Sequence, residues 1–157
     1  MEKRAETILV SACLLGIDCR YNGTSRKNDK VIEWLKDRIF IPVCPESLSG
    51  LPVPRDPAEY DRGDGSELRT GKSRILMRDG TDVSKQFMRG AVETLKAVRL
   101  VKATQAVLKD RSPSCGVYSV YNRGHLVHGV GCFTSLLLLE GIAVKSEKDI
   151  ERLYQEL

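Results

Sequence analysis

Short apolar runs alternate with segments of helical periodicity along this chain, and this alternation constrains the fold more than any other feature. The runs at 8–12, 40–43, 105–108 and 142–145 have the length and composition of buried strands. The longest helical pattern lies at 83–102, where apolar residues recur at three- and four-residue steps. Parallel strands need long crossovers, and helices supply them. The order therefore predicts an α/β fold with a mostly parallel sheet and helices on both faces.

Three further helices complete the pattern. The first is expected to begin at Asn28 or Asp29, either of which can cap it, and to end near Arg38. A second helix, apolar enough to be buried, is expected at 132–140. The third is expected after Ser146, which forms a capping-box pattern with the acidic residue three positions later.

The remaining segments show weaker patterns. Residues 45–81 hold four of the six prolines and are expected to be irregular, apart from a short strand at 73–77. Two strand-like runs at 117–121 and 126–130 flank an Asn/Gly turn and predict a hairpin. Pro42 lacks a backbone N–H, so its strand is expected at an edge of the sheet.

The bulk properties predict one small domain spanning residues 1–157, because this length supports a single core. The net charge is +4, but the basic residues form no block, so a nucleic-acid partner is not expected. No stretch of 18 apolar residues exists, and no membrane partner is expected. The apolar run within residues 1–16 is too short for a signal peptide, which predicts a cytoplasmic location.

Five cysteines stand out: Cys13, Cys19, Cys44, Cys115 and Cys132. Their odd number and the expected reducing compartment argue against a disulfide framework. Cys13 follows the first strand, Cys44 the second, and Cys115 lies in the loop after the third. Ligands bind at the carboxyl ends of strands in such sheets, so these three thiols are expected to converge. Unrelated buried cysteines are an equally weighted alternative at this point.

Three converging thiolates suit two kinds of metal site. One is a single catalytic ion such as zinc with an open position, and the other is a four-iron cluster with one iron free of protein ligands. Glu46 lies two residues after Cys44 and is a candidate for proton transfer, although a loop glutamate is often merely solvated. Ser112 and Ser114 are candidates for hydrogen bonds to a substrate, with turn formation as the alternative.

Several other segments match known binding motifs only in part. Residues 70–73 resemble the end of a phosphate-binding loop but lack its earlier glycine. Gly129-Val-Gly131 lacks the third glycine of a dinucleotide fingerprint, although its backbone N–H groups remain candidates for binding an anion. His125 and His128 are three residues apart on a strand, so they point to opposite faces and do not share a metal.

Five short motifs together resemble one known family, the 2-thiouracil desulfurases. They occur in the family's order and cover nearly the whole chain. The motifs are SACLLG at 11–16, CRYNG at 19–23, PVCPE at 42–46, KDRSPSCG at 109–116 and GVG at 129–131.

The resemblance implies a Rossmann-like fold and a [4Fe-4S] cluster held by Cys13, Cys44 and Cys115. The free iron then binds the thiocarbonyl sulfur of a small thiolated pyrimidine base or nucleotide, and water replaces the sulfur without net redox change. Glu46 matches the family's proton-handling acid and Ser112 its active-site serine.

Two cysteines stay outside the ligand set that the resemblance implies. Cys19 lies in a family motif, where it either supports the Cys13 loop or stands as a nearby thiol. Cys132 begins a helix and is expected to serve packing. A zinc-dependent hydrolase that uses Cys13, Cys44 and Cys115, and a nucleotide-binding module without catalysis, are the two competing hypotheses.

Overall fold

The main sheet of the computed structural model, which describes residues 5–156, is parallel throughout. Its strands lie in the order β2-β1-β5-β8. The bounds are β1 (Thr7–Ser11), β2 (Ile39–Val43), β5 (Gln105–Leu108) and β8 (Ala143–Ser146). The α/β class with a mostly parallel sheet is thus confirmed, and β2 occupies an edge as Pro42 predicted.

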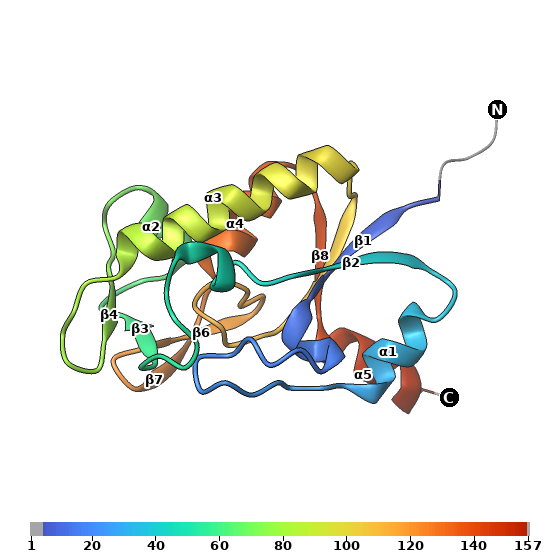
Figure 1. Cartoon of the computed structure of the whole chain (residues 1–157), viewed down its shortest axis with the longest axis horizontal. Helices are drawn as coiled ribbons and strands as arrows, with labels where there is room; N and C mark the ends of the chain where they lie inside the picture. The colour runs from blue at the N-terminus through green and yellow to red at the C-terminus, as the bar shows by residue number, and fades with distance from the viewer. Residues whose placement is uncertain (1–4, 157) are drawn as a thin grey trace.

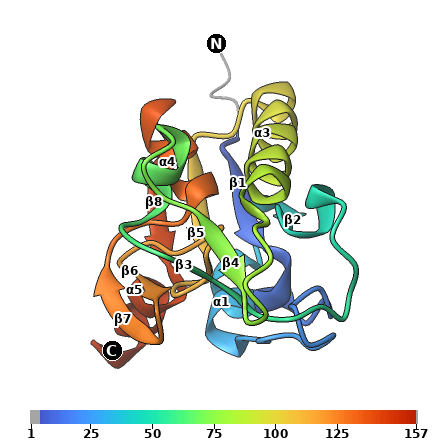
Figure 2. The ribbon, with the colours of Figure 1, turned by 90° about the vertical axis from the view of Figure 1, so that its left-hand side faces the viewer.

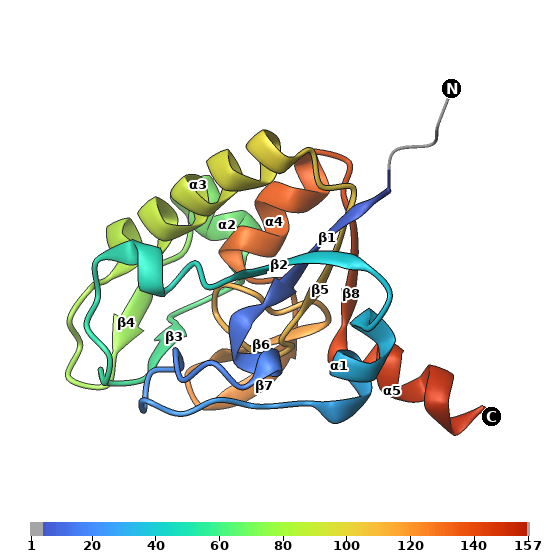
Figure 3. The same ribbon diagram turned by 45° about the vertical axis from the view of Figure 1, so that its right-hand side comes forward.

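Two helices cover each face of this sheet (Figure 3). One face carries α1 (Asp29–Leu35) and α5 (Glu147–Gln155), and the other carries α3 (Ser84–Val101) and α4 (Cys132–Leu139). Side chains of strand β1 point alternately to the two faces of the sheet and pack against the helices on both sides. Ile8 and Val10 pack toward α1 and α5, whereas Leu9 packs toward α3 and α4.

The helix caps form largely as predicted. The side chain of Asn28 accepts a hydrogen bond from the backbone N–H of Val31 at 3.1 Å. Ser146 and Asp149 form the expected capping box at the start of α5. Helix α1 ends at Leu35 rather than near Arg38, because the chain tightens into a turn before β2.

A second sheet corrects the expectation of an irregular segment at 45–81 (Figures 1 and 2). That segment forms a 3-10 turn, η2 (Ser47–Ser49), then β3 (Ala58–Tyr60), α2 (Gly65–Arg69) and β4 (Ile75–Met77). The predicted hairpin supplies β6 (Ser119–Asn122) and β7 (His125–His128), which complete the order β4-β3-β6-β7. Strands of three residues are too short to show an alternating pattern in sequence, and β3 pairs with β6 from far along the chain.

Two expectations fall partly outside the described residues. The interpretation of the N-terminal segment includes residues 1–4, and the single-domain expectation includes these residues and residue 157. Within residues 5–156, no helix combines the length and the apolar character that crossing a membrane requires.

Candidate functional site

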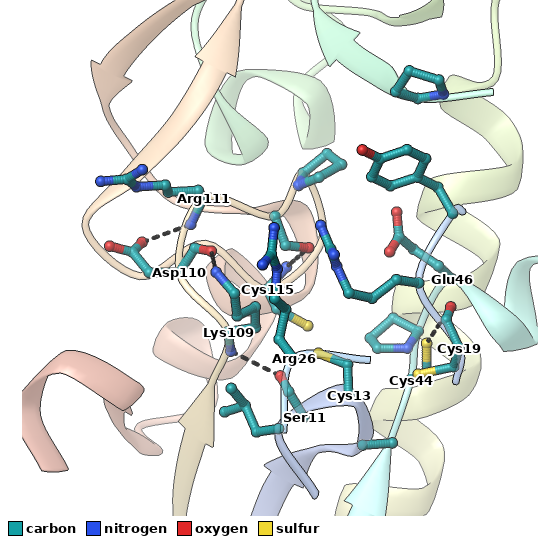
Figure 4. Close-up of a pocket in the computed structure, with 18 of the residues that line it drawn as sticks. Ser11, Cys13, Cys19, Arg26, Cys44, Glu46, Lys109, Asp110, Arg111 and Cys115 are labelled. Atoms are coloured by element: carbon teal, nitrogen blue, oxygen red, sulfur yellow. Dashed lines mark hydrogen bonds between the residues drawn. The ribbon is translucent and has the colours of Figure 1, made fainter. Parts of the chain in front are cut away.

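Cys13, Cys44 and Cys115 all line one cavity of about 860 Å³ at the carboxyl edge of the main sheet. Strands β1 and β2 end together, because Ser11 pairs with Val43. Cys13 lies in the 3-10 turn η1 (Ala12–Leu15) that follows β1 directly. The structure therefore brings together the three thiols that the strand order placed at one edge (Figure 4).

Cys19 also lines this cavity, and Cys132 does not. The thiol of Cys44 donates a hydrogen bond to the backbone carbonyl of Cys19 at 3.9 Å. Cys132 is fully buried in the core, where its thiol donates to the Phe87 carbonyl at 3.8 Å. Four of the five thiols thus belong to the site, and the fifth belongs to the packing of α4 against α3.

The loop that carries Cys115 is fixed to the start of α4. The first backbone N–H groups of a helix have no partner within the helix. Here the carbonyl of Pro113 accepts from Cys132 at 3.0 Å, and that of Ser114 accepts from Phe133 at 2.9 Å. Tyr60 of β3 donates its hydroxyl to the Pro113 carbonyl at 2.5 Å. The second sheet and α4 together hold Cys115 in place.

The Gly129–Gly131 motif packs this loop rather than binding an anion. The N–H of Val130 donates to Asp64 at 2.9 Å, and that of Gly131 donates to the Gly116 carbonyl at 2.9 Å. The anion-binding interpretation is therefore wrong, because both donors are already used. A Cβ at Gly131 would lie 2.2 Å from the carbonyl oxygen of Ser114, so only glycine permits this close approach.

Asp110 organises the same loop from its centre. Its carboxylate is fully buried, and one oxygen accepts hydrogen bonds from the backbone N–H groups of Val117, Tyr118 and Ser119 at 3.0–3.1 Å. The other oxygen lies 3.0 Å from the Lys148 ammonium. The sequence analysis assigned no role to Asp110. Its place in the KDRSPSCG motif, just after a buried strand, could have indicated that it belongs to the site.

These contacts set the ionisation of Asp110. Burial alone would raise the pKa of the carboxyl group. The N–H groups of Tyr118, Val117 and Ser119 and the Lys148 ammonium outweigh burial and lower the pKa to about 2. An unperturbed aspartate has a pKa of about 3.9, so the ionised form is markedly more stable in the folded chain.

We expect Asp110→Asn to lower the free energy of unfolding by at least about 2 kcal/mol at pH 7. A lowered pKa gives stability that is present above the unfolded-state pKa and is lost as the pH falls through the folded-state pKa. The stability gap between the parent and the variant should therefore narrow between about pH 4 and pH 2. Denaturant unfolding at neutral and acidic pH measures this gap, and a gap that is constant over that range would contradict the assignment.

Glu46 lies at the cavity beside a buried cation. Its side chain is 17% exposed, and the Arg55 guanidinium, only 2% exposed, lies 3.3 Å from its carboxylate. Burial raises the pKa of Glu46 to about 7, although Arg55 acts to lower it. Arg55 is anchored by donating to the Pro52 carbonyl at 3.2 Å. A carboxyl group with a pKa near neutrality is suited to accepting and returning protons.

Ser112 and Ser114 have different surroundings in the structure: Ser112 lines the cavity and Ser114 does not. The hydroxyl oxygen of Ser112 accepts from the backbone N–H groups of Ser114 at 3.2 Å and Cys115 at 3.1 Å. Ser112 therefore shapes the turn before Cys115 and also lines the cavity. Ser114 is buried and is not among the cavity-lining residues, so its hydroxyl is not placed to meet a substrate there.

The thiols differ in their ionisation. Burial raises the pKa of Cys13 to about 12 and that of Cys115 well above its usual range. A hydrogen bond between Cys19 and Cys44 lowers the pKa of Cys44 and raises that of Cys19. Metal ligation requires thiolates, so binding of a metal group here would release protons from Cys13 and Cys115.

The chemistry of the lining fits a cluster. The three strand-end thiols share the cavity lining with Arg20, Arg26 and Arg111, and with Arg55 and Lys109, which pair with the acidic side chains of Glu46 and Glu147. Within residues 5–156, no three His, Cys, Asp or Glu side chains gather closely enough to hold one metal ion. Three thiols that line one cavity are a donor set that a multi-iron cluster can use at three of its corners. The fold and site define an α/β protein with a cysteine-lined cavity at the carboxyl edge of its parallel sheet.

Comparison with known proteins places this chain among the desulfurases. The 2-thiouracil desulfurase family model matches residues 8–149, and the chain belongs to this family, as its motifs indicated. The uncharacterized protein YbbK of Bacillus subtilis (strain 168) is 38% identical over 146 residues, which cover 91% of this chain and 97% of YbbK. The structure of the [4Fe-4S]-dependent thiouracil desulfidase TudS matches with a TM-score of 0.78 and 37% identity, over 96% of this chain and 97% of TudS.

Proposed function

We propose that this chain is a [4Fe-4S]-dependent desulfurase that converts thiolated pyrimidines, such as 2-thiouracil or thiolated uridine nucleotides, into their oxo forms. The observation that carries the proposal is the single cavity lined by Cys13, Cys44 and Cys115. Family membership and the likeness to TudS support it. We place the reaction in the cytoplasm, as the sequence predicts.

Cys13, Cys44 and Cys115 would hold the cluster as thiolates. When bound, the cluster supplies an iron without a protein ligand, which acts as a Lewis acid toward the substrate's sulfur. Arg20, Arg26 and Arg111, which also line the cavity, would offset part of the charge of the three thiolates. The cavity, at about 860 Å³, is also within the usual size range for sites that bind a small molecule beside a cofactor.

Glu46 is the proposed proton-transfer residue. Its carboxylate borders the cavity, and its raised pKa keeps both protonation states available near neutral pH. The group passes the two protons of the attacking water, one after the other, to the departing sulfur. In total one C=S bond and one water become one C=O bond and one H₂S, and no electrons are consumed.

Ser112 is the proposed contact to the pyrimidine. Its oxygen already accepts two backbone hydrogen bonds, so its hydroxyl proton is the group left to donate. A pyrimidine carbonyl or ring nitrogen is a matching acceptor. Ser112 therefore orients the ring and also fixes the turn that positions Cys115.

Anaerobic reconstitution with iron and sulfide tests the proposed function. The loaded protein should contain about four irons per chain. It should release sulfide and oxo product in equal amounts from 2-thiouracil or a thiolated uridine nucleotide. The matched control is the same protein loaded with zinc. Activity of the zinc form after removal of iron would contradict the cluster and favour the hydrolase hypothesis.

A further inference from the structure

We propose that Arg55 is a positioning residue for the reaction: its buried guanidinium holds the Glu46 carboxylate in the orientation that proton transfer requires. This inference rests on the proposed function, because that function assigns the proton transfer to Glu46. It gives a role to a residue that neither the sequence motifs nor the proposed reaction uses.

The Arg55 side chain is fixed at both of its ends. The backbone N–H of Arg55 donates to the Tyr21 carbonyl at 2.6 Å, and Nη1 donates to the Pro52 carbonyl at 3.2 Å. The side chain is only 2% exposed. An arginine loses much rotamer freedom on burial, and a buried charge is unfavourable unless it is paired. The group that pairs with Arg55 therefore indicates what this side chain does.

That group is the Glu46 carboxylate, whose Oε2 lies 3.3 Å from Nη2 of Arg55. Among residues 5–156, Glu46 has no ion pair besides this one, and Lys109 of the cavity lining pairs with Glu147 instead. Glu46 is 17% exposed, so it can meet a substrate in the cavity, whereas Arg55 presents almost no surface to one. Arg55 therefore acts on the reaction through Glu46.

The backbone of Glu46 is fixed separately from its carboxylate. Its carbonyl accepts from the Ser49 N–H at 3.2 Å, and the preceding residue, Pro45, lies against Gly90 of α3. A Cβ at Gly90 would lie 2.0 Å from the Pro45 carbonyl oxygen, so a larger residue would push the segment away. Because the backbone is held in this way, the freedom left to Glu46 is rotation of its side chain, which Arg55 restrains.

The contact restrains the carboxylate without locking it. Nη2 of Arg55 is buried and forms no hydrogen bond within the described part of the chain, so its 3.3 Å contact with Glu46 is one of charge rather than an aligned hydrogen bond. A small rotation of the carboxylate is enough to align one. Glu46 is thus kept at one place in the cavity wall and retains the rotation that a group passing protons needs.

The first test compares loaded proteins after anaerobic reconstitution. Arg55→Met keeps a long unbranched side chain but removes the charge. It should lower kcat about 10- to 100-fold, with KM within about two-fold of the parent and the iron content unchanged. Arg55→Lys keeps a positive charge and should recover part of the loss. A double variant, Arg55→Met with Glu46→Gln, should be no slower than Glu46→Gln alone, because Arg55 acts through Glu46.

The matched control is Arg99→Met, which removes a cation that pairs with Glu140 on the surface and should retain the parental rate. The second test needs no cluster and measures denaturant unfolding of the metal-free proteins. If Arg55 holds Glu46, the double variant should lose less unfolding free energy than the sum of the losses in the two single variants.

Three results would overturn this inference alone. They are a parental kcat in loaded Arg55→Met, a raised KM with unchanged kcat, which would make Arg55 a substrate contact, and additive losses in the unfolding series. Should circular dichroism show that Arg55→Met does not fold, Arg55→Lys is tested in its place and should lower kcat at unchanged KM. If the loaded parent releases no sulfide, the proposed function fails and the role of Arg55 in it fails too, whereas non-additive unfolding losses would still show the pair.

Discussion

Replacing Cys115 by alanine is expected to reduce the iron content from about four atoms per chain to near zero and to abolish desulfuration. The loop around Cys115 is held by α4, Tyr60 and Asp110 and contains no second cysteine that could replace it. Iron analysis, the visible absorption of the reconstituted protein and sulfide release measure the effect.

Cys132→Ala is the matched control, since it removes a buried thiol that does not line the cavity. It should retain both iron and activity at parental levels. A Cys115→Ala protein that binds iron and releases sulfide as well as the parent would refute the ligand assignment. Unfolding measurements on the metal-free proteins separate loss of a ligand from loss of the fold.

Glu46→Gln should slow desulfuration by about 10²- to 10⁴-fold while leaving the iron content unchanged. Glutamine keeps the size and polarity of the side chain, but it can neither take a proton from water nor return one. Initial rates under anaerobic conditions, normalised to iron content, measure the change. Glu93→Gln is the control, because Glu93 lies on the surface of α3 and pairs with Lys96.

The two glutamate variants separate proton transfer from general electrostatics. Glu93→Gln replaces a carboxyl group by an amide, as Glu46→Gln does, and should retain the parental rate. A Glu46→Gln protein that turns over within a few-fold of the parent would show that another group moves the proton. Loss of iron from the same variant would instead place Glu46 among the groups that hold the cluster.

The main sheet was predictable because its strands and helices carry local signals. The Asn28 cap and the Ser146 capping box each lie within a few residues, and the 83–102 periodicity lies within one continuous segment, so each marks its helix locally. The second sheet was not predictable in this way. Strands β3 and β4 have three residues each, and β3 pairs with β6, which lies far along the chain.

The candidate site likewise has features that local sequence predicts and features that depend on contacts between distant segments. The convergence of Cys13, Cys44 and Cys115 could be predicted, because each follows a strand and the strand ends share an edge in a parallel sheet. The ion pair of Glu46 with Arg55 and the contacts of Asp110 could not be predicted, since a sequence does not show which loops approach each other. The Gly129–Gly131 motif was misinterpreted for the same reason: its donors are used by Asp64 and Gly116, which lie elsewhere in the chain.

The attachment of the Pro113–Cys115 loop to the start of α4 bears on how the site is assembled. The hydrogen bonds of that attachment use backbone groups and the Tyr60 hydroxyl and leave the Cys115 sulfur free, so the shape of the loop does not depend on ligation of a metal by this sulfur. Metal sites that fold only around their ion lose conformational entropy on binding, and the affinity for the ion is reduced accordingly. A preorganised loop avoids most of this loss. Insertion of the cofactor then becomes a binding event on a finished scaffold rather than the last step of folding.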